Sequence, residues 1–270
     1  MPVADDLGHP VDLAGPPTRI VSLVPSLTEA LALSVPDRLV GATEWCTRPE
    51  GLAVARVRGT KNPDHAAIAG LRPDLVVANQ EENRRVDVER LRAAGTAVWV
   101  TRVESVDGAL ASLGRLLVEG VGVTTPTWLE DARATWGRPP RLPPLRVVVP
   151  VWRDPWMVVG PSTYAGDVVA RLGLVMAPDA GPGRYPKVEP ERLRALRPDL
   201  VLLPDEPYAF TADDGPEAFP GIPTVLVPGR SLTWYGPAMV AARRELEDLV
   251  APVTGASGTG WDITLRGRLQ

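Results

Sequence analysis

The sequence predicts an α/β protein of two Rossmann-like lobes, each with a parallel sheet, joined by a helical connection and enclosing a ligand cleft between the lobes. The hexapeptide LRPDLV occurs twice, and strand-like segments on either side of it recur with it. The paired segments begin at Arg19 and Arg146, at Leu71 and Leu196, and at Gly95 and Gly221. Their nearly constant spacing indicates a duplicated unit, and small ligands usually bind between such domains.

In the first lobe, short apolar runs alternate with helical segments. Ser26 and Glu29 form a capping-box pattern, Pro73 prevents continuation of a helix ending near Arg72, and Gly95 suits the residue after a helix. The predicted strands are 20–24, 39–42, 75–78 and 97–100, and a further helix covers 85–94. Strands that alternate with helices predict a parallel sheet with right-handed crossovers.

Residues 103–138 lie outside the repeat and are predicted to be mostly helical. Their apolar residues recur at helical spacing, and Thr125-Pro126 offers an N-cap and a first helical residue. A flexible hinge would be rich in Gly and Ser, so we expect little relative motion. The predicted domains are an N-terminal lobe 1–102, the helical connection 103–138, and a C-terminal lobe 139–270 whose tail 255–270 has no assigned role.

Composition excludes several classes of protein. A net charge of -4 over 270 residues, without a basic run, lacks the electrostatic footprint of a nucleic-acid binder. No uncharged apolar run is long enough to insert into a membrane. The acidic start lacks a secretory signal, so we expect a cytoplasmic protein, or a periplasmic or cell-surface one if a signal was removed. Cys46 is the single cysteine, which excludes an intramolecular disulfide and a Cys-rich metal site.

Trp and Tyr side chains gather just after predicted strands, where open α/β sheets place their ligand crevices. Trp occurs eight times and Phe only twice, which favours binding surfaces because Trp and Tyr join an apolar face to a polar group. The candidates for ligand binding are Trp45, Trp152, Trp156, Tyr185, Tyr208, Trp234 and Tyr235. Alternatively, each ring packs against its own sheet edge or under a loop. Trp99 is assigned to a core, and Trp128 and Trp136 are expected to hold the connection against a lobe; Trp261 lies in the tail.

Polar candidates are fewer. Glu82 and Asn83 follow a strand and suit either ligand hydrogen bonding or a solvated helix start. Arg153 can hold a ligand carboxylate or phosphate through its fork, or be neutralised by Asp154. Cys46 is a weak candidate metal ligand, since a lone loop thiol is more often incidental.

No catalytic residues are predicted, because the GxSxG, phosphate-loop and HExxH patterns are absent. The two histidines, His9 in a hairpin turn and His65 at a helix start, suit structural roles better than ligation. These residues and the absence of catalytic motifs therefore favour a binding protein over an enzyme, and no catalytic cofactor is expected.

Seven segments follow one another along the chain: RIVSLVPSLTE at 19–29, GTKNPD at 59–64, LRPDLVVANQEENR at 71–84, WRDPWMVVG at 152–160, RYPKV at 184–188, LRPDLVLLPDEPY at 196–208 and TWYG at 233–236. Together they resemble the helical-backbone metal receptor superfamily, the class III substrate-binding proteins for cobalamin, haem and ferric siderophores. The resemblance is strongest to the cobalamin-binding branch. It implies aromatic contacts to a corrin from both lobes, with Trp45, Tyr185 and Trp234 at such positions.

The resemblance also implies an exposed glutamate on each lobe that docks an ABC permease. Glu191, seven residues before Pro198, has that place in the second lobe, whereas Ala66 has it in the first. We therefore expect a monomeric, non-enzymatic protein that binds a flat metal-containing cofactor, cobalamin or another tetrapyrrole or metal chelate, as a cytosolic carrier or sensor. The alternatives are an ABC-transporter receptor and a tetrapyrrole-modifying enzyme.

Overall fold

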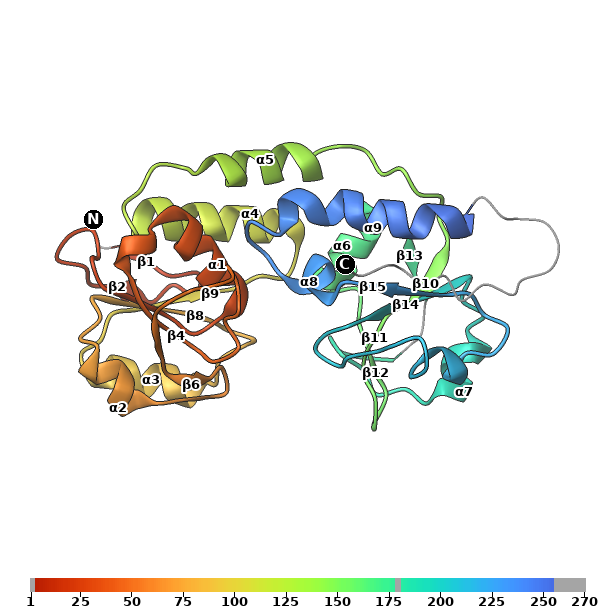
Figure 1. Cartoon of the computed structure of the whole chain (residues 1–270), viewed down its shortest axis with the longest axis horizontal. Helices are drawn as coiled ribbons and strands as arrows, with labels where there is room; N and C mark the ends of the chain where they lie inside the picture. Colours follow the sequence, from red (N-terminus) through yellow and green to blue (C-terminus); the bar gives the residue numbers. More distant parts are fainter. Residues whose placement is uncertain (1–2, 178–180, 255–270) are drawn as a thin grey trace. The chain divides into compact units, whose positions relative to one another are not determined.

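The computed structural model describes residues 3–177 and 181–254, which form two compact units (Figure 1). Unit 1 comprises 3–103, 107–134 and 235–240, and unit 2 comprises 104–106, 135–177, 181–234 and 241–254. Within these residues, no helix combines the length and the apolar character needed to span a lipid bilayer.

Unit 1 contains a five-stranded parallel sheet with helices on both faces (Figure 1). Its strand order is β5 (Ala55–Arg56), β4 (Leu39–Ala42), β3 (Ile20–Ser22), β8 (Leu75–Asn79) and β9 (Val98–Thr101). Helices α2 (His65–Gly70) and α3 (Arg85–Ala93) lie on one face, and α1 (Pro25–Ser34) and α4 (Val106–Arg115) on the other. Two small hairpins complete the unit: β1 (Val3–Ala4) with β2 (Pro10–Val11), and β6 (Arg58–Gly59) with β7 (Asn62–Pro63).

Unit 2 contains a four-stranded parallel sheet in the order β13 (Val175–Met176), β10 (Arg146–Val148), β14 (Leu200–Pro204) and β15 (Thr224–Val227). An antiparallel hairpin of β11 (Pro150–Trp152) and β12 (Met157–Val158) follows β10 directly. The helices are α6 (Tyr164–Arg171), α7 (Pro190–Ala195), α8 (Gly229–Thr233) and α9 (Met239–Thr254). The fold class predicted from the sequence, α/β with a parallel sheet in each lobe, is confirmed.

The central strand pairs of the two units have equivalent registers. Ile20 pairs with Leu75 in unit 1, and Val147 pairs with Leu200 in unit 2. Ile20 and Val147 stand at equivalent positions in the two copies of the sequence repeat, and so do Leu75 and Leu200. The two copies of the repeat therefore occupy the same topological place in each unit, as the duplication predicts.

Each LRPDLV copy fixes that register by the same contacts. The second residue of each copy has a left-handed φ, 46° at Arg72 and 50° at Arg197, which turns the chain from helix to strand. The aspartate then accepts a hydrogen bond from the start of the neighbouring strand in the sheet: Asp74 from the amide of Arg19, directly before β3, at 2.9 Å, and Asp199 from the amide of Arg146 in β10 at 2.8 Å. A helix end, a reversal and a strand start are thus encoded in six residues.

The predicted capping box at Ser26 is wrong. Helix α1 begins at Pro25 with Val24 as its N-cap, and no side chain caps it. Proline suits the first helical position because its fixed φ is helical and its missing N–H would have no partner there. Ser26 consequently lies inside the helix, where it is buried.

The connection is helical, as the sequence predicts. It consists of α4, a π-helical turn at Leu116–Gly120, and α5 (Thr127–Trp136). Trp128 donates a hydrogen bond to the Ser34 hydroxyl at 3.1 Å, and Trp136 is buried under the Arg243 guanidinium, 5.8 Å from its ring. Both tryptophans thus hold the connection in place. The proposed domain boundaries at 102 and 138 remain predictions.

Candidate functional site

Trp45 is the most exposed of the predicted aromatic residues in unit 1. It follows β4 at the carboxyl edge of the sheet, and 67% of its surface is accessible. The indole packs beside Gly59 of β6, where an added Cβ would lie 3.2 Å from the indole nitrogen. The hairpin therefore holds one side of the ring while leaving most of it open to a ligand.

Cys46, beside Trp45, is buried in the protein. Its sulfur lies 3.0 Å from the Thr28 hydroxyl and 3.1 Å from the Thr43 hydroxyl. Burial raises the pKa of the Cys46 thiol, so it stays neutral. In the part of the chain that the structure describes, no three His, Cys, Asp or Glu side chains gather into a group that could hold a metal.

Asn83 has its amide engaged within unit 1. Its oxygen accepts the Asn79 amide at 2.9 Å, and its NH2 group donates to the carbonyl oxygens of Thr60 at 2.9 Å and Leu23 at 3.3 Å. Glu82 is half-buried beside it; burial raises the pKa of its carboxyl group, and the positive charge of Lys61 opposes that rise. These residues precede α3, and Asn83 joins three segments of backbone.

The two histidines have contacts that explain them without a ligand. His65 is the first residue of α2, and its Nε2 lies 2.9 Å from the buried Asp87 carboxylate of α3, which Arg84 also contacts at 2.7 Å. His9 lies in the turn of the β1–β2 hairpin, as predicted, and its carbonyl accepts the Asp5 amide at 2.9 Å.

In unit 2, the hairpin that follows β10 carries two tryptophans with opposite environments. Trp152 is 43% exposed, and its ring meets Tyr208 edge-on with centroids 5.9 Å apart. Trp156 is only 7% exposed, stacked on Phe210 at 5.7 Å and edge-on to Phe219 at 5.6 Å. Trp156 therefore belongs to the hydrophobic core, while Trp152 presents its ring at the surface.

Arg153, between these tryptophans, is paired with two carboxylates. It contacts Asp214 and lies 2.5 Å from Glu217, with its guanidinium 5.4 Å from the Trp156 ring centroid. Tyr208 donates its hydroxyl to Asp214 at 2.6 Å. The hydrogen bond to Glu217 raises the pKa of Arg153, and the one to Asp214 raises the pKa of Tyr208. The neutralising acids are thus Asp214 and Glu217, neither of which was among the residues predicted from the sequence.

Trp234 is half-buried at the C-cap of α8, where Arg230 lies 5.5 Å from its ring centroid and the Tyr164 hydroxyl donates to its carbonyl at 3.2 Å. Tyr235 is buried, with 6% of its surface accessible. Tyr185 is half-buried in the loop before Pro186.

The structure brings four predicted residues into one cluster at the carboxyl edge of the unit 2 sheet: Trp152, Arg153, Trp156 and Tyr208. Asp214 and Glu217 complete the cluster. Their acidic loop, DDGPE, was visible in the sequence, but loop residues follow no period that would have paired them with Arg153. Trp156 and Tyr235 are buried, and the side-chain amide of Asn83 is engaged in hydrogen bonds within the protein. The role of these three residues in binding stays a prediction.

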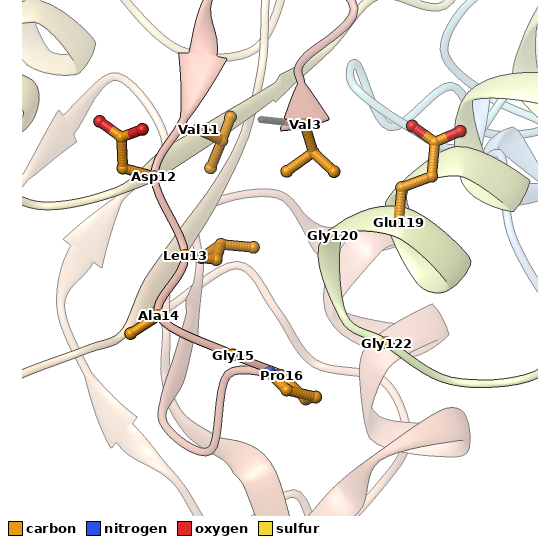
Figure 2. A pocket seen from close by; sticks show the side chains of 10 residues that line it. All are labelled: Val3, Val11, Asp12, Leu13, Ala14, Gly15, Pro16, Glu119, Gly120 and Gly122. Carbon is orange, nitrogen blue, oxygen red and sulfur yellow. The ribbon is translucent and has the colours of Figure 1, made fainter. Parts of the chain in front are cut away.

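A separate cavity of about 640 Å³ lies in unit 1 between the N-terminal segment and the π-helical turn (Figure 2). Its lining consists of Val3, Val11, Asp12, Leu13, Ala14, Gly15, Pro16, Glu119, Gly120 and Gly122. The carboxylates of Asp12 and Glu119 do not point toward one another in Figure 2. None of the predicted site residues lines this cavity.

No model of a known protein family matches the sequence. The vitamin B12-binding protein of Vibrio vulnificus strain CMCP6 is 25% identical over 207 residues, which cover 73% of this chain and 74% of the relative. The periplasmic vitamin B12 binding protein BtuF of Vibrio cholerae superposes with a TM-score of 0.68 at 19% identity, covering 88% of this chain and 98% of that one. The periplasmic heme-binding protein BhuT, solved with two hemes, gives 0.71 at 25% identity, covering 87% and 98%.

These likenesses extend over most of both partners, and the structure has the parallel sheets and helical connection that the sequence motifs imply. In sequence and fold the chain is therefore similar to the class III substrate-binding proteins of the helical-backbone metal receptor superfamily.

Proposed function

We propose that this chain is a non-enzymatic binding protein for a corrinoid such as vitamin B12, in preference to haem or a ferric siderophore. The observation that carries the proposal is the exposed Trp152 ring held edge-on by Tyr208 at the carboxyl edge of the unit 2 sheet. Trp45 offers a second open ring, held by Gly59, at the equivalent edge of unit 1. The vitamin B12-binding relative supports the corrinoid, and the heme-bound structure supports a flat tetrapyrrole more generally.

The chemistry of the rings fits such a ligand. A corrin is a broad, largely apolar macrocycle, and fixed aromatic side chains contact flat rings without losing much side-chain freedom. Trp45 and Trp152 are each fixed by a neighbour, so they are preorganised for this contact. Both rings are held before any ligand arrives.

Titration of cyanocobalamin and haem into the wild type and into Trp45→Ala, Trp152→Ala and Trp234→Ala variants tests the proposal. Removal of a stacking ring should weaken binding by roughly 1 to 3 kcal/mol, by analogy with the stacking of planar bases on aromatic side chains. Trp128→Phe, which alters a tryptophan of the helical connection, is the matched control. Unchanged affinity in both Trp45→Ala and Trp152→Ala would contradict the assignment.

The physiological role rests on a difference between α2 and α7. Glu191 is the second residue of α7 and is exposed, with a 2.9 Å ion pair to Arg194, whereas the second residue of α2 is Ala66. A permease that contacts one carboxylate on each lobe would meet Glu191 on α7 but no carboxylate at the equivalent position of α2. This favours a carrier or sensor, while the periplasmic relatives support the alternative of a transport receptor.

An ATPase assay with a reconstituted cobalamin ABC transporter separates these roles. We expect ligand binding without stimulation by the wild type, and stimulation after Ala66→Glu supplies the second carboxylate. Fractionation of native cells should then find the protein in the cytosol. Robust stimulation by the wild type, with no gain from Ala66→Glu, would favour the receptor. Mass spectrometry of the bound corrinoid after incubation checks the third alternative, because an enzyme would change the ligand's mass.

A further inference from the structure

The carboxylates around Arg153 are held in place by groups other than the arginine. Glu217 accepts the Gly215 backbone amide at 2.5 Å, and Asp214 accepts the Tyr208 hydroxyl at 2.6 Å. Burial alone would raise the pKa of Glu217, but the Gly215 amide and Arg153 lower it overall, so this carboxyl group is ionised at neutral pH. The two carboxyl groups are therefore held in place beside Arg153.

One cation against two carboxylates leaves this cluster with a net charge of -1. Asp214 and Glu217 both contact Nη1 of Arg153, so two carboxylates lie at one edge of its guanidinium. A ligand carboxylate that approached this guanidinium would lie beside both of them and be repelled. The cluster thus opposes free carboxylates although it contains an arginine.

The same cluster suits hydrogen-bond donors. Each ionised carboxylate offers about four acceptor positions, and the contacts to Arg153, Tyr208 and Gly215 use only part of them. Amide NH2 groups can fill the remaining positions without adding charge. The nearby Trp152 ring, exposed beside Tyr208, would bring the edge of a bound macrocycle to this cluster.

We infer that Asp214 and Glu217 determine specificity, selecting a tetrapyrrole whose peripheral carboxyl groups are amidated and rejecting one with free carboxylates. The inference rests on the proposed function and names its ligand class. The Tyr208 hydroxyl supports this inference. It donates a hydrogen bond to Asp214 and so remains protonated. A protonated phenol is a poor ligand for haem iron, which binds tyrosine as the phenolate.

Two other cations of unit 2 are already paired with carboxylates. Arg184 pairs with Glu104 at 3.0 Å, and Arg194, which also donates to the Ala218 carbonyl beside Glu217, pairs with Glu191 at 2.9 Å. Lys187 is exposed and lies across from Met157 of the hairpin. Lys187 could attract a ligand anion, so the experiment includes Lys187→Gln.

The test compares two corrinoids with one ring and one metal: dicyanocobinamide, whose side chains are amides, and dicyanocobyrinic acid, whose side chains are free carboxylates. Calorimetric titration at pH 7 should show that the wild type prefers dicyanocobinamide by roughly tenfold or more, about one charge-assisted contact. The Asp214→Asn/Glu217→Gln double variant frees Arg153 and should bind dicyanocobyrinic acid more tightly, reducing the preference to about threefold or less. If that variant does not fold, each single substitution should shift the preference in the same direction.

Asp213→Asn is the matched control, since it removes one charge from the same loop but none of the carboxylates that contact Arg153. Neither it nor Lys187→Gln should change the preference by more than about twofold. Equal affinity of the wild type for both corrinoids, an unchanged preference in the double variant, or an equal change in Asp213→Asn would each overturn the inference. A wild type that binds neither corrinoid would instead overturn the proposed function and this inference with it.

Discussion

Strands β8 of unit 1 and β14 of unit 2 begin alike and end differently. At their amino ends, Asp74 and Asp199 make the same contact to the start of the neighbouring strand in the sheet, β3 and β10 respectively. At their carboxyl ends, Asn83 closes the unit 1 loop on its own backbone, whereas Tyr208 joins a half-exposed cluster in unit 2. The duplicated unit therefore keeps the end that sets the register and varies the carboxyl end, where we propose that the ligand binds.

The difference has a physical basis. Once the amino ends of two parallel strands are tied together, their pairing is fixed, since a slip of one residue would move every side chain to the opposite face of the sheet. The loops at the other end can then change without altering the sheet. In unit 1 the loop is closed by hydrogen bonds, whereas in unit 2 it carries aromatic and charged side chains.

The largest effect on stability is expected at Trp156, the residue of the unit 2 cluster that lies in the hydrophobic core. Trp156→Ala should lower the free energy of unfolding by about 3–5 kcal/mol, because a buried ring packed between Phe210 and Phe219 leaves a cavity. Trp152→Ala, on the same hairpin, should cost less than about 1 kcal/mol. Urea denaturation of both variants, with hydrogen exchange of the β14 amides, measures this contrast. Equal losses would show that the two rings are not divided between core and surface.

In unit 1, Asn83→Ala should cost about 2 kcal/mol, because it leaves the Asn79 amide and two carbonyl groups without their partner. Gln80→Ala, an exposed change in the same loop, is the control. Urea denaturation followed by fluorescence reports the loss. If Asn83→Ala is as stable as the control, the loop is not closed by this amide.

At the amino ends of β8 and β14, Asp74→Ala should lower the free energy of unfolding by about 2 kcal/mol and Asp199→Ala by about 1 kcal/mol. Both carboxylates are exposed, and Asp74 accepts more short charge-assisted hydrogen bonds than Asp199. Asp74 accepts two bonds from Thr18 and one from Arg19, whereas the short bond of Asp199 is that from the Arg146 amide. Similar losses at both positions would mean that the Thr18 contacts contribute nothing.

The same tethers predict a dependence on pH. Hydrogen bonds from Thr18 hold the pKa of Asp74 below its ordinary value, and the Arg146 amide does so for Asp199. Their stabilisation is complete above the unfolded pKa of about 3.9 and is lost as pH falls through the lower folded pKa. Unfolding free energies measured from pH 6 to pH 2 should therefore fall less steeply in Asp74→Asn than in the wild type.

The smallest effect concerns how unit 1 holds its open ring. In Gly59→Ala the new Cβ would lie 2.5 Å from Asn62 Oδ1 and 3.2 Å from the Trp45 indole nitrogen, so both side chains must shift, at about 1 kcal/mol or less. The indole N–H resonance of Trp45, assigned by comparison with Trp45→Phe, should move. The Trp152 resonance of unit 2 should stay unchanged.

The sequence by itself determined the fold class, the duplication, and the positions of the strands and most helices. It did so because LRPDLV is local: a helix end, a left-handed turn and a strand start within six residues leave their signature in residue types alone. The same local logic placed α3 before Gly95, which has a φ of 81°. It failed at Ser26, where two local signals competed and Pro25 began the helix instead.

Only the tertiary structure decided which side chains at the strand ends are free to bind. Trp152 and Trp156 lie four residues apart in a similar context, yet one is exposed and the other buried, because Phe210 and Phe219 come from a loop far along the chain. Arg153 likewise meets acids 61 and 64 residues away. Such contacts follow from how loops pack on a finished sheet, and no periodic pattern in the sequence records that packing.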